Sequence, residues 1–207
     1  MMLDFDVPKA HRTENTKEEM KMKKKIWLLC ILATGAVSCL AVIWFAGQPK
    51  YQDVIDTAKI VDYEDAEAVI DDSVLIARVK KTGEVPSSHF YDLGLPMENT
   101  LSVVDVEEVF QNSGDALIST GSEIYVLESQ WTDEESKTVH HLNGYLKMET
   151  GNQYLLLLGY NPSVGNYYPL GLLYGKIPID LKEDLFLGQG YEQVKETIDV
   201  LRERYCS

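Results

Sequence analysis

The chain has 207 residues, of which 45% are hydrophobic, and a formal net charge of -14, so its length allows one domain with additional segments. Residues 1–25 carry a net charge of +2 and residues 26–46 carry none, which leaves a net charge of -16 on residues 47–207. Because affinity for nucleic acid comes largely from Lys and Arg on phosphate, this charge excludes nucleic acid as a partner. It also opposes direct contact with anionic lipid.

The N-terminal residues 1–25 are predicted to be a short cytoplasmic tail. Residues 1–19 are polar and aperiodic, and they are too short for a domain, which indicates disorder. The true start is open between Met1, Met20 and Met22, and a start at Met20 or Met22 would reduce the tail to a few lysines.

An uncharged segment follows at residues 26–46 (IWLLCILATGAVSCLAVIWFA). A helix of this length spans about 30 Å, which matches the hydrocarbon core of a bilayer. Trp27 and Trp44 lie near its two ends, where indole rings prefer the headgroup interface. Three consecutive lysines precede it: Lys23, Lys24 and Lys25. By the positive-inside rule, the segment is predicted to be an uncleaved transmembrane signal-anchor, single-pass in the cell membrane, with residues 47–207 outside the cell.

Two alternatives to an uncleaved anchor stay open. Residues 36–39 (AVSC) resemble a relaxed lipobox, which would make Cys39 a lipidation site, but the apolar run continues beyond that cysteine. The second alternative is cleavage of the segment as a signal peptide. Such a site requires a small residue three positions before the cleaved bond, and around residues 45–48 this position is bulky Ile43, Trp44 or Phe45.

The first part of the outer region is predicted to contain a linker, a helix and a strand. Residues 47–63 are predicted to be a juxtamembrane linker before a domain at residues 64–207. Apolar residues at helical spacing indicate a short amphipathic helix around residues 64–71. Alternating apolar and β-branched residues then indicate a strand over residues 73–81, and the prolines and glycine of residues 85–99 indicate a long loop.

The middle of the outer region is predicted to contribute two clear strands. These are residues 100–110, with a bulge or strand end at residues 107–110, and residues 123–128. Residues 129–143 (SQWTDEESKTVHHLN) are polar and indicate a loop. Residues 145–149 are predicted to form a short strand.

The last part of the chain is predicted to contribute the remaining strands and a helix. Residues 153–160 (QYLLLLGY) are apolar and too short for a core helix, which indicates a buried central strand. Residues 167–178 are predicted to form the last strands, and residues 190–207 have apolar residues at helical spacing, which predicts a C-terminal amphipathic helix. The expected class is mainly β, with a small antiparallel barrel between two helices.

The order of these segments resembles uncharacterised exported Gram-positive proteins with an OB-like barrel, distantly similar to the netrin/metalloproteinase-inhibitor fold. The resemblance covers residues 64–180 and is carried by DDSVLIARVKK, by the turn at Gly114-Asp115, and by residues 151–158 (GNQYLLLL). It implies an OB-like barrel. Metalloproteinase inhibitors of this fold act through an N-terminal disulfide-bonded cysteine, and nothing comparable stands in this chain, so no inhibitory residue is carried over. A shared fold implies a shape and not an activity.

Histidines are the most reactive candidates in the outer region. His140 and His141 lie beside an acidic stretch, but neighbouring strand residues point to opposite faces, so one metal would not bind both. The acidic stretch lacks the spacing of a calcium loop. His89 lies near Ser87, Ser88 and Asp92, but residues this close in one loop rarely form a triad.

The remaining motifs predict no cofactor, metal or catalytic residue. The sequence has no nucleophile-elbow motif and no phosphate-binding loop. Cys30 and Cys39 lie in the apolar run and Cys206 near the C-terminus, so no internal disulfide is expected in the outer domain, and Cys206 is expected to be a free terminal thiol.

A cluster of tyrosines is the candidate ligand platform, because aromatic rings combine apolar area with a polar group. Its members are Tyr160, Tyr167, Tyr168 and Tyr174. The sequence therefore predicts a non-enzymatic binding or interaction module, anchored in a bacterial membrane, with an unidentified protein or envelope partner. The alternatives are a sensor that signals through its N-terminal tail, and a cell-surface hydrolase that uses His89 or His140.

Overall fold

The computed structural model describes residues 50–86, 99–180, 186–187 and 192–206. In chain order its elements are β1 (Gln52–Asp56), α2 (Ala66–Asp72), β2 (Leu75–Val85), β3 (Thr100–Asn112), β4 (Glu123–Glu128), β5 (Gln130–Asp133), β6 (Thr138–Leu142), β7 (Gln153–Asn161), β8 (Asn166–Pro169), β9 (Lys176–Pro178) and α4 (Glu192–Tyr205). The chain is mainly β. No helix among these residues is both long and apolar enough to cross a membrane. The predicted anchor at residues 26–46 lies outside the described residues.

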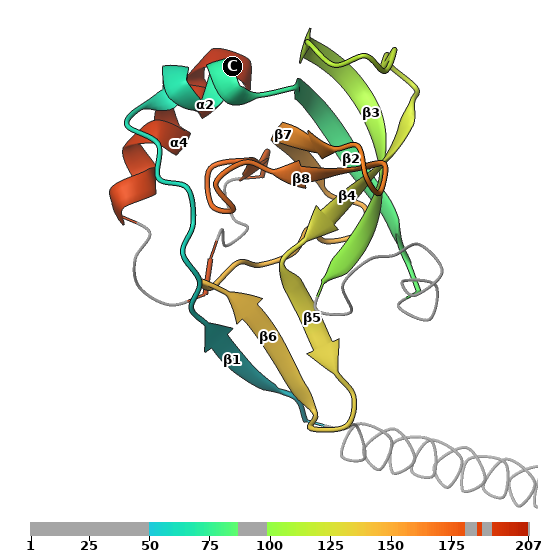
Figure 1. Cartoon of the computed structure of the whole chain (residues 1–207), viewed down its shortest axis with the longest axis vertical. Coiled ribbons are helices and arrows are strands. Elements are labelled where there is room, and N and C mark those ends of the chain that lie inside the picture. Colours follow the sequence, from blue (N-terminus) through green and yellow to red (C-terminus); the bar gives the residue numbers. More distant parts are fainter. Residues whose placement is uncertain (1–49, 87–98, 181–185, 188–191, 207) are drawn as a thin grey trace, which may run out of the picture. The chain divides into compact units, whose positions relative to one another are not determined.

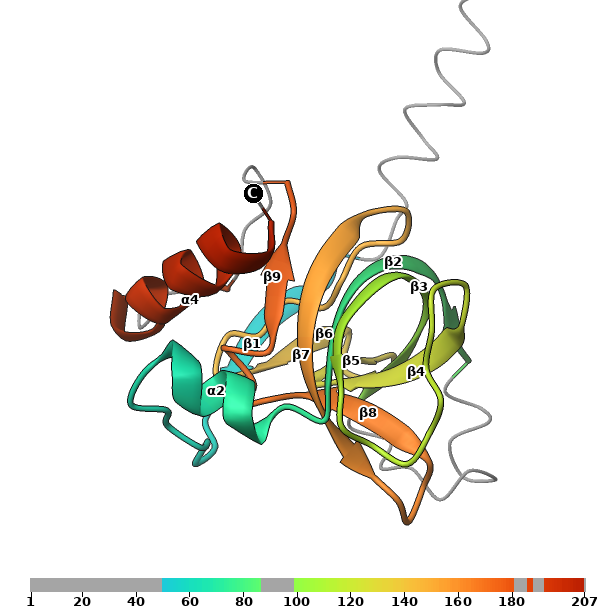
Figure 2. The same ribbon diagram turned by 90° about the horizontal axis from the view of Figure 1, so that it is seen from above.

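Five strands close into a barrel, as the sequence predicted. The hydrogen-bonded order is β2-β3-β4-β8-β7, and β2 also pairs with β7, which joins the two ends of the sheet. Four of these pairings are antiparallel, whereas β4 and β8 are parallel. Figure 2 shows the ring that these strands form, with the helices on one side of it.

The run QYLLLLGY is uniformly apolar because β7 is buried on both faces. Tyr154, Leu156 and Leu158 point into the barrel interior, whereas Leu155 and Leu157 belong to a second core outside the wall. This second core lies between the barrel and the two helices. The predicted buried central strand is therefore confirmed, and its continuous hydrophobicity reflects two cores rather than one.

Three register shifts curve the long hairpin of β2 and β3. One lies between Lys81 and Gly83, and the other two, between Ile76 and Ala77 and between Arg78 and Val79, lie opposite residues 107–110 of β3. The sequence predicted an irregularity at this position. A bulge increases local twist and bends the strand, and β2 must bend because it pairs with both β3 and β7 to close the barrel.

The two helices pack side by side against one face of the barrel, where β9 lies beside β7 (Figure 2). The apolar face of α4 buries Val194, Ile198 and Leu201. Helix α2 buries Ala66, Val69 and Ile70, and its first turn is capped by the Asp65 side chain. Both helices occur where the spacing of apolar residues predicted them.

The prediction of a loop at residues 129–143 was wrong. Strands β5 and β6 form a hairpin there, and β1, which lies within the predicted linker, pairs with β6 in parallel. This three-stranded sheet extends away from the barrel (Figure 1). Its strands are short and mostly polar, so they lack the apolar alternation that marks a half-buried strand.

The prediction of a strand at residues 145–149 was also wrong, because side chains satisfy the backbone of this segment. Glu128 accepts from the Met148 N–H at 2.8 Å, and Tyr154 accepts from the Glu149 N–H at 2.7 Å. Lys81 donates to the Met148 carbonyl at 2.7 Å. The buried Lys176 donates to the Leu146 carbonyl and lies 4.7 Å from the Tyr145 ring centroid.

Candidate functional site

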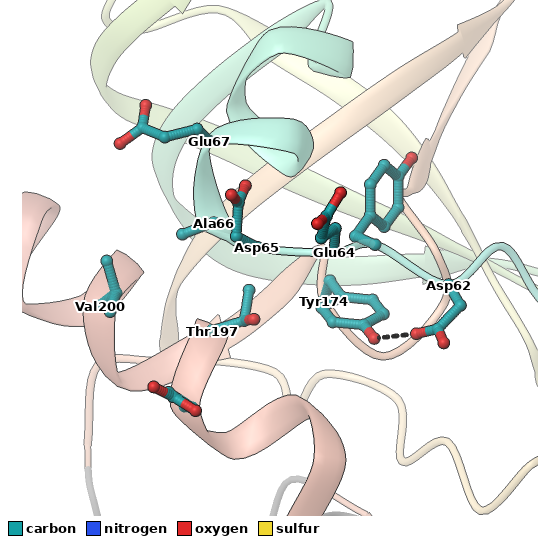
Figure 3. Close-up of a pocket in the computed structure, with 10 residues that line it drawn as sticks. Asp62, Glu64, Asp65, Ala66, Glu67, Tyr174, Thr197 and Val200 are labelled. Atoms are coloured by element: carbon teal, nitrogen blue, oxygen red, sulfur yellow. Dashed lines mark hydrogen bonds between the residues drawn. The ribbon is translucent and has the colours of Figure 1, made fainter.

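A cleft of about 580 Å³ opens between α2, α4 and the segment that leads into α2 (Figure 3). This volume lies within the range of small-molecule sites in proteins. The side chains that line it are Asp62, Tyr63, Glu64, Asp65, Ala66, Glu67, Tyr174, Glu196, Thr197 and Val200. We call this feature the acidic cleft, because half of its lining residues are carboxylates and none is Lys, Arg or His.

The chain brings these carboxylates together for a local structural reason. Residues 62–67 (DYEDAE) precede and begin α2, and Asp65 accepts a hydrogen bond of 2.9 Å from the Ala68 N–H as the N-cap. Acidic side chains are favoured at a helix N-terminus, where the helix dipole is positive. Helix α4 supplies the opposite wall through Glu196, Thr197 and Val200.

Two tyrosines form the aromatic end of the acidic cleft. Tyr63 and Tyr174 pack edge to face, with ring centroids 5.4 Å apart and an interplanar angle of 80°. Tyr174 donates a 2.6 Å hydrogen bond to Asp62, and Tyr63 donates one of 2.8 Å to Asp72. Burial and the bond to Asp62 raise the pKa of Tyr174 to about 12. Both hydroxyls therefore remain neutral donors to carboxylates.

One carboxylate of the acidic cleft is neutralised by an ion pair. Arg204 contacts both carboxylate oxygens of Glu67, which lowers the pKa of Glu67. This pair links α2 to α4. The carboxylates of Glu64 and Glu196 form no hydrogen bond or ion pair with the part of the chain that the structure describes. A small-molecule cation that enters the cleft would therefore meet carboxylates that are not already neutralised.

A second cluster joins β1 to β6 through two histidine–aspartate pairs. His140 Nδ1 lies 2.8 Å from Asp56, and His141 Nε2 lies 2.9 Å from Asp53. The two rings point to opposite faces of the strand. The Trp131 ring stacks on His140, with centroids 4.7 Å apart. The sequence predicted a polar loop at these histidines, but both lie on β6, and His141 is only 3% exposed.

The predicted tyrosine platform is divided between two places. Tyr160 and Tyr167 pack together on the β7–β8 hairpin, with ring centroids 5.0 Å apart, although Tyr167 is buried. Tyr168 is half-exposed and lies over Gly159. Tyr174 is buried at the acidic cleft. The structure thus brings Tyr174 together with Tyr63, which the sequence analysis did not select.

Several predicted residues lie outside the described residues. They are Trp27, Trp44, Lys23, Lys24, Lys25, Cys30, Cys39, Ser87, Ser88, His89 and Asp92. Cys206 is described, is partly buried against the helix core, and has no disulfide partner there. Burial raises the pKa of its thiol. Within the described ranges, no three His, Cys, Asp or Glu residues come together to hold a metal ion.

Sequence reasoning missed the residues of the acidic cleft and the aspartates of β1. The signal for the first was the acidic run at residues 62–67 directly before a predicted helix. No spacing rule linked Asp53 and Asp56 to histidines so far along the chain.

Comparison with known protein families found no family model that matches this chain, and comparison with curated proteins found no match.

Proposed function

We propose that this chain is a non-enzymatic binding module whose acidic cleft takes a small cationic ligand with an apolar part. The observation that carries this proposal is the cleft itself: a small-molecule-sized recess with five carboxylates, no basic lining residue and two packed tyrosines. Carboxylates select the charge of the ligand, and aromatic rings attract both apolar groups and cations.

We further propose that the barrel is OB-like and belongs with the exported barrels that the sequence resembles. Support comes from the strand order β2-β3-β4-β8-β7, with closure between β2 and β7 and a parallel β4–β8 pair. A five-stranded Greek-key barrel of this kind is typical of OB folds. The strongly acidic surface disfavours the oligonucleotide ligands of many OB folds.

The location we propose is the outer face of a bacterial cell membrane, with residues 26–46 as the anchor. The support is the length of this apolar segment, the lysines before it and the tryptophans near its ends. Anchoring would raise the effective concentration of the acidic cleft for ligands and partners in the envelope. Lipidation at Cys39 and signal cleavage remain the alternatives.

Ligand-observed NMR with two matched probes tests the binding proposal. Phenethylamine and phenylacetate share an aromatic ring and a short chain but have opposite charges. We expect only phenethylamine to bind. The double substitution Glu64→Gln/Glu196→Gln should weaken it about tenfold, because two charges near the ligand are lost. The control Glu123→Gln/Glu135→Gln removes two exposed carboxylates elsewhere and should leave binding unchanged. Equal binding of both probes would contradict the proposal.

Cysteine labelling of intact cells tests the location. Leu117 is 97% exposed in the segment between β3 and β4, so Leu117→Cys in a chain without its native cysteines provides a reactive outer site. An impermeant maleimide should label this cysteine, whereas Thr13→Cys in the N-terminal tail should react only after lysis. Labelling of Thr13→Cys alone would reverse the proposed orientation.

A sensor that signals through its N-terminal tail is the second candidate. Deletion of residues 1–19 should then abolish a cytoplasmic response without affecting ligand binding outside. An unchanged response would leave the plain binding module as the better explanation.

A cell-surface hydrolase is the third candidate, because Asp56, His140 and Thr138 are hydrogen-bonded in the order of a catalytic triad. However, Ser136 donates its hydrogen to Asp133 and so accepts the hydrogen of Thr138. Thr138 then accepts from His140, which is the reverse of the contact in which a base takes the proton of a hydroxyl nucleophile. Fluorophosphonate labelling that disappears in Thr138→Val would revive this candidate.

A further inference from the structure

Thr197 is a polar residue on the buried face of helix α4. Val194, Ile198 and Leu201 of this face are buried in the core between the helix and the barrel. Thr197 lies three residues after Val194 and four before Leu201. Residues three and four apart share one face of a helix, so Thr197 occupies a position where an apolar side chain is normally found.

The Thr197 hydroxyl makes no hydrogen bond with the residues that the structure describes, although the side chain is only 8% exposed. A buried hydroxyl without a partner lowers stability, and valine has nearly the same shape without this cost. Thr197 lines the acidic cleft, and Figure 3 shows its side chain directed from α4 toward Asp65 and Tyr174. The hydroxyl is therefore placed to meet a group that enters the cleft.

Two carboxylates of the acidic cleft are also without a partner among the described residues. Glu196 precedes Thr197 on α4, and Glu64 lies on the opposite wall, in the segment before α2. The other three carboxylates of the cleft already accept a hydrogen bond or form an ion pair. The cleft thus combines two carboxylates that can only accept with one hydroxyl that can accept as well.

We propose that Thr197 makes the acidic cleft selective for ammonium ligands that carry N–H hydrogens, so that it takes primary amines in preference to quaternary ammonium ions. This inference rests on the proposed function, because a cation must first enter the cleft. It adds to that function a residue that distinguishes one kind of cation from another, whereas the carboxylates select only the charge.

The number of hydrogens on the ligand nitrogen is the reason for the preference. A primary ammonium group has three, which Glu64, Glu196 and the Thr197 hydroxyl can accept. A quaternary ammonium ion has none, so its methyl groups would leave the buried hydroxyl without a partner. Proteins recognise such ions instead with cages of aromatic faces. In the cleft, the rings of Tyr63 and Tyr174 pack edge to face against each other.

The apolar part of the ligand has a surface beside the same groups. Val200 lies four residues after Glu196 on α4, lines the cleft and is exposed, and Ala66 lines the cleft from α2. An apolar group that covers Val200 removes hydrophobic area from water. A primary amine on a short apolar chain therefore fits both parts of the cleft.

Titration calorimetry of the full chain in detergent micelles tests the selectivity, with micelles alone as the blank. The probes are phenethylamine and N,N,N-trimethylphenethylammonium, which share a ring, a chain and a charge. We expect phenethylamine to bind about tenfold more tightly, because hydrogen bonds to a charged group are strong. Equal affinities would overturn this inference and leave a cleft that binds cations. Binding of neither probe would contradict the proposed function itself.

Substitutions at Thr197 identify the selecting group. Thr197→Val should weaken binding of phenethylamine about tenfold and leave the trimethyl probe unchanged, so the preference disappears. Thr197→Ser retains the hydroxyl and should retain the preference. Thr132→Val, at an exposed threonine of β5, is the matched control and should change neither affinity. Equal weakening of both probes by Thr197→Val would overturn the inference.

Thermal denaturation without added probe separates a binding role of the hydroxyl from a structural one. Thr197→Val should melt at the wild-type temperature or above it, because the substitution removes a buried polar group that has no partner in the described part of the fold. A lower melting temperature would mean that the hydroxyl stabilises the fold, and it would overturn the inference.

Discussion

At the scale of single residues, the stability of the barrel depends on a buried polar network at one end. Lys81 and Glu128 are both 0% exposed, with Nζ and Oε1 3.5 Å apart. Glu128 also accepts hydrogen bonds from Ser102, from the Tyr145 hydroxyl at 2.8 Å and from the Met148 N–H. Burial, together with the charge of Glu128, raises the pKa of Tyr145 well above its ordinary value. Every contact of Glu128 requires it to accept.

We expect Glu128→Gln to destabilise the domain by about 2 to 3 kcal/mol, because a buried carboxylate is lost and Lys81 keeps only its 2.6 Å ion pair with Glu84. Its amide group would also face donors. Chemical denaturation measures this loss. Glu123→Gln, at the exposed end of the same strand, should change stability by no more than about 0.5 kcal/mol. A similar effect of both substitutions would show that the network is not important for stability.

Gly175 is a second residue that determines stability, because its position has no room for a side chain. A Cβ atom there would lie 2.2 Å from the Leu170 nitrogen and 2.6 Å from the Leu157 carbonyl oxygen, and backbone atoms cannot move aside cheaply. We expect Gly175→Ala to cost about 3 kcal/mol or more, because it overpacks the core. Gly83 in β2 has no atom within 4 Å of such a Cβ. In thermal denaturation, the melting temperature of Gly83→Ala should therefore be close to that of the wild type.

The sequence could not predict which polar residues are buried. Lys81 continues the alternation of Leu75, Ala77 and Val79, so its position faces the interior, yet lysine is normally exposed. Its burial becomes predictable only when Glu128 and the Met148 carbonyl are known to meet it. The same holds for His141, whose partners come from β1 and from the segment after β6. The usual rules give the preference of one residue type for the surface or the interior. Burial of a charged side chain depends instead on the partner groups that lie beside it in the fold.

At the scale of elements, the strands of the barrel were predictable and the small sheet was not. β2, β3 and β7 carry strong apolar patterns because one or both faces are buried. β5 and β6 are polar, since a sheet that extends from the domain has little interior to face. The acidic cleft was also hidden, because it forms only when α4 packs against α2 from the far end of the chain.

Helix α4 should contribute to stability mainly through its buried face. We expect Ile198→Ala to destabilise the domain by about 2 to 5 kcal/mol, because Ile198 is 0% exposed in the core between the helix and the barrel. Val200→Ala is the matched control. Val200 is 42% exposed, so its truncation should cost less than about 0.5 kcal/mol in denaturant titration. Equal losses would mean that α4 packs differently.

At the scale of the whole molecule, the barrel and the small sheet should open separately. The barrel has a continuous core, whereas the small sheet has short strands and one buried histidine. Native-state hydrogen exchange in increasing denaturant should show β2, β3 and β7 opening together at the global free energy of unfolding. β1, β5 and β6 should open at a lower free energy. A single common opening free energy would contradict this division.

Closure of the barrel by β2 also determines the order in which the fold can be completed. β2 pairs first with β3, its neighbour in sequence, but its other partner, β7, comes much later in the chain. Pairings between distant segments form slowly, because a long loop must close first. While the chain is being synthesised, one edge of β2 therefore stays open until β7 emerges. The charged residues Arg78 and Lys80 along this strand disfavour its pairing with another chain in that interval.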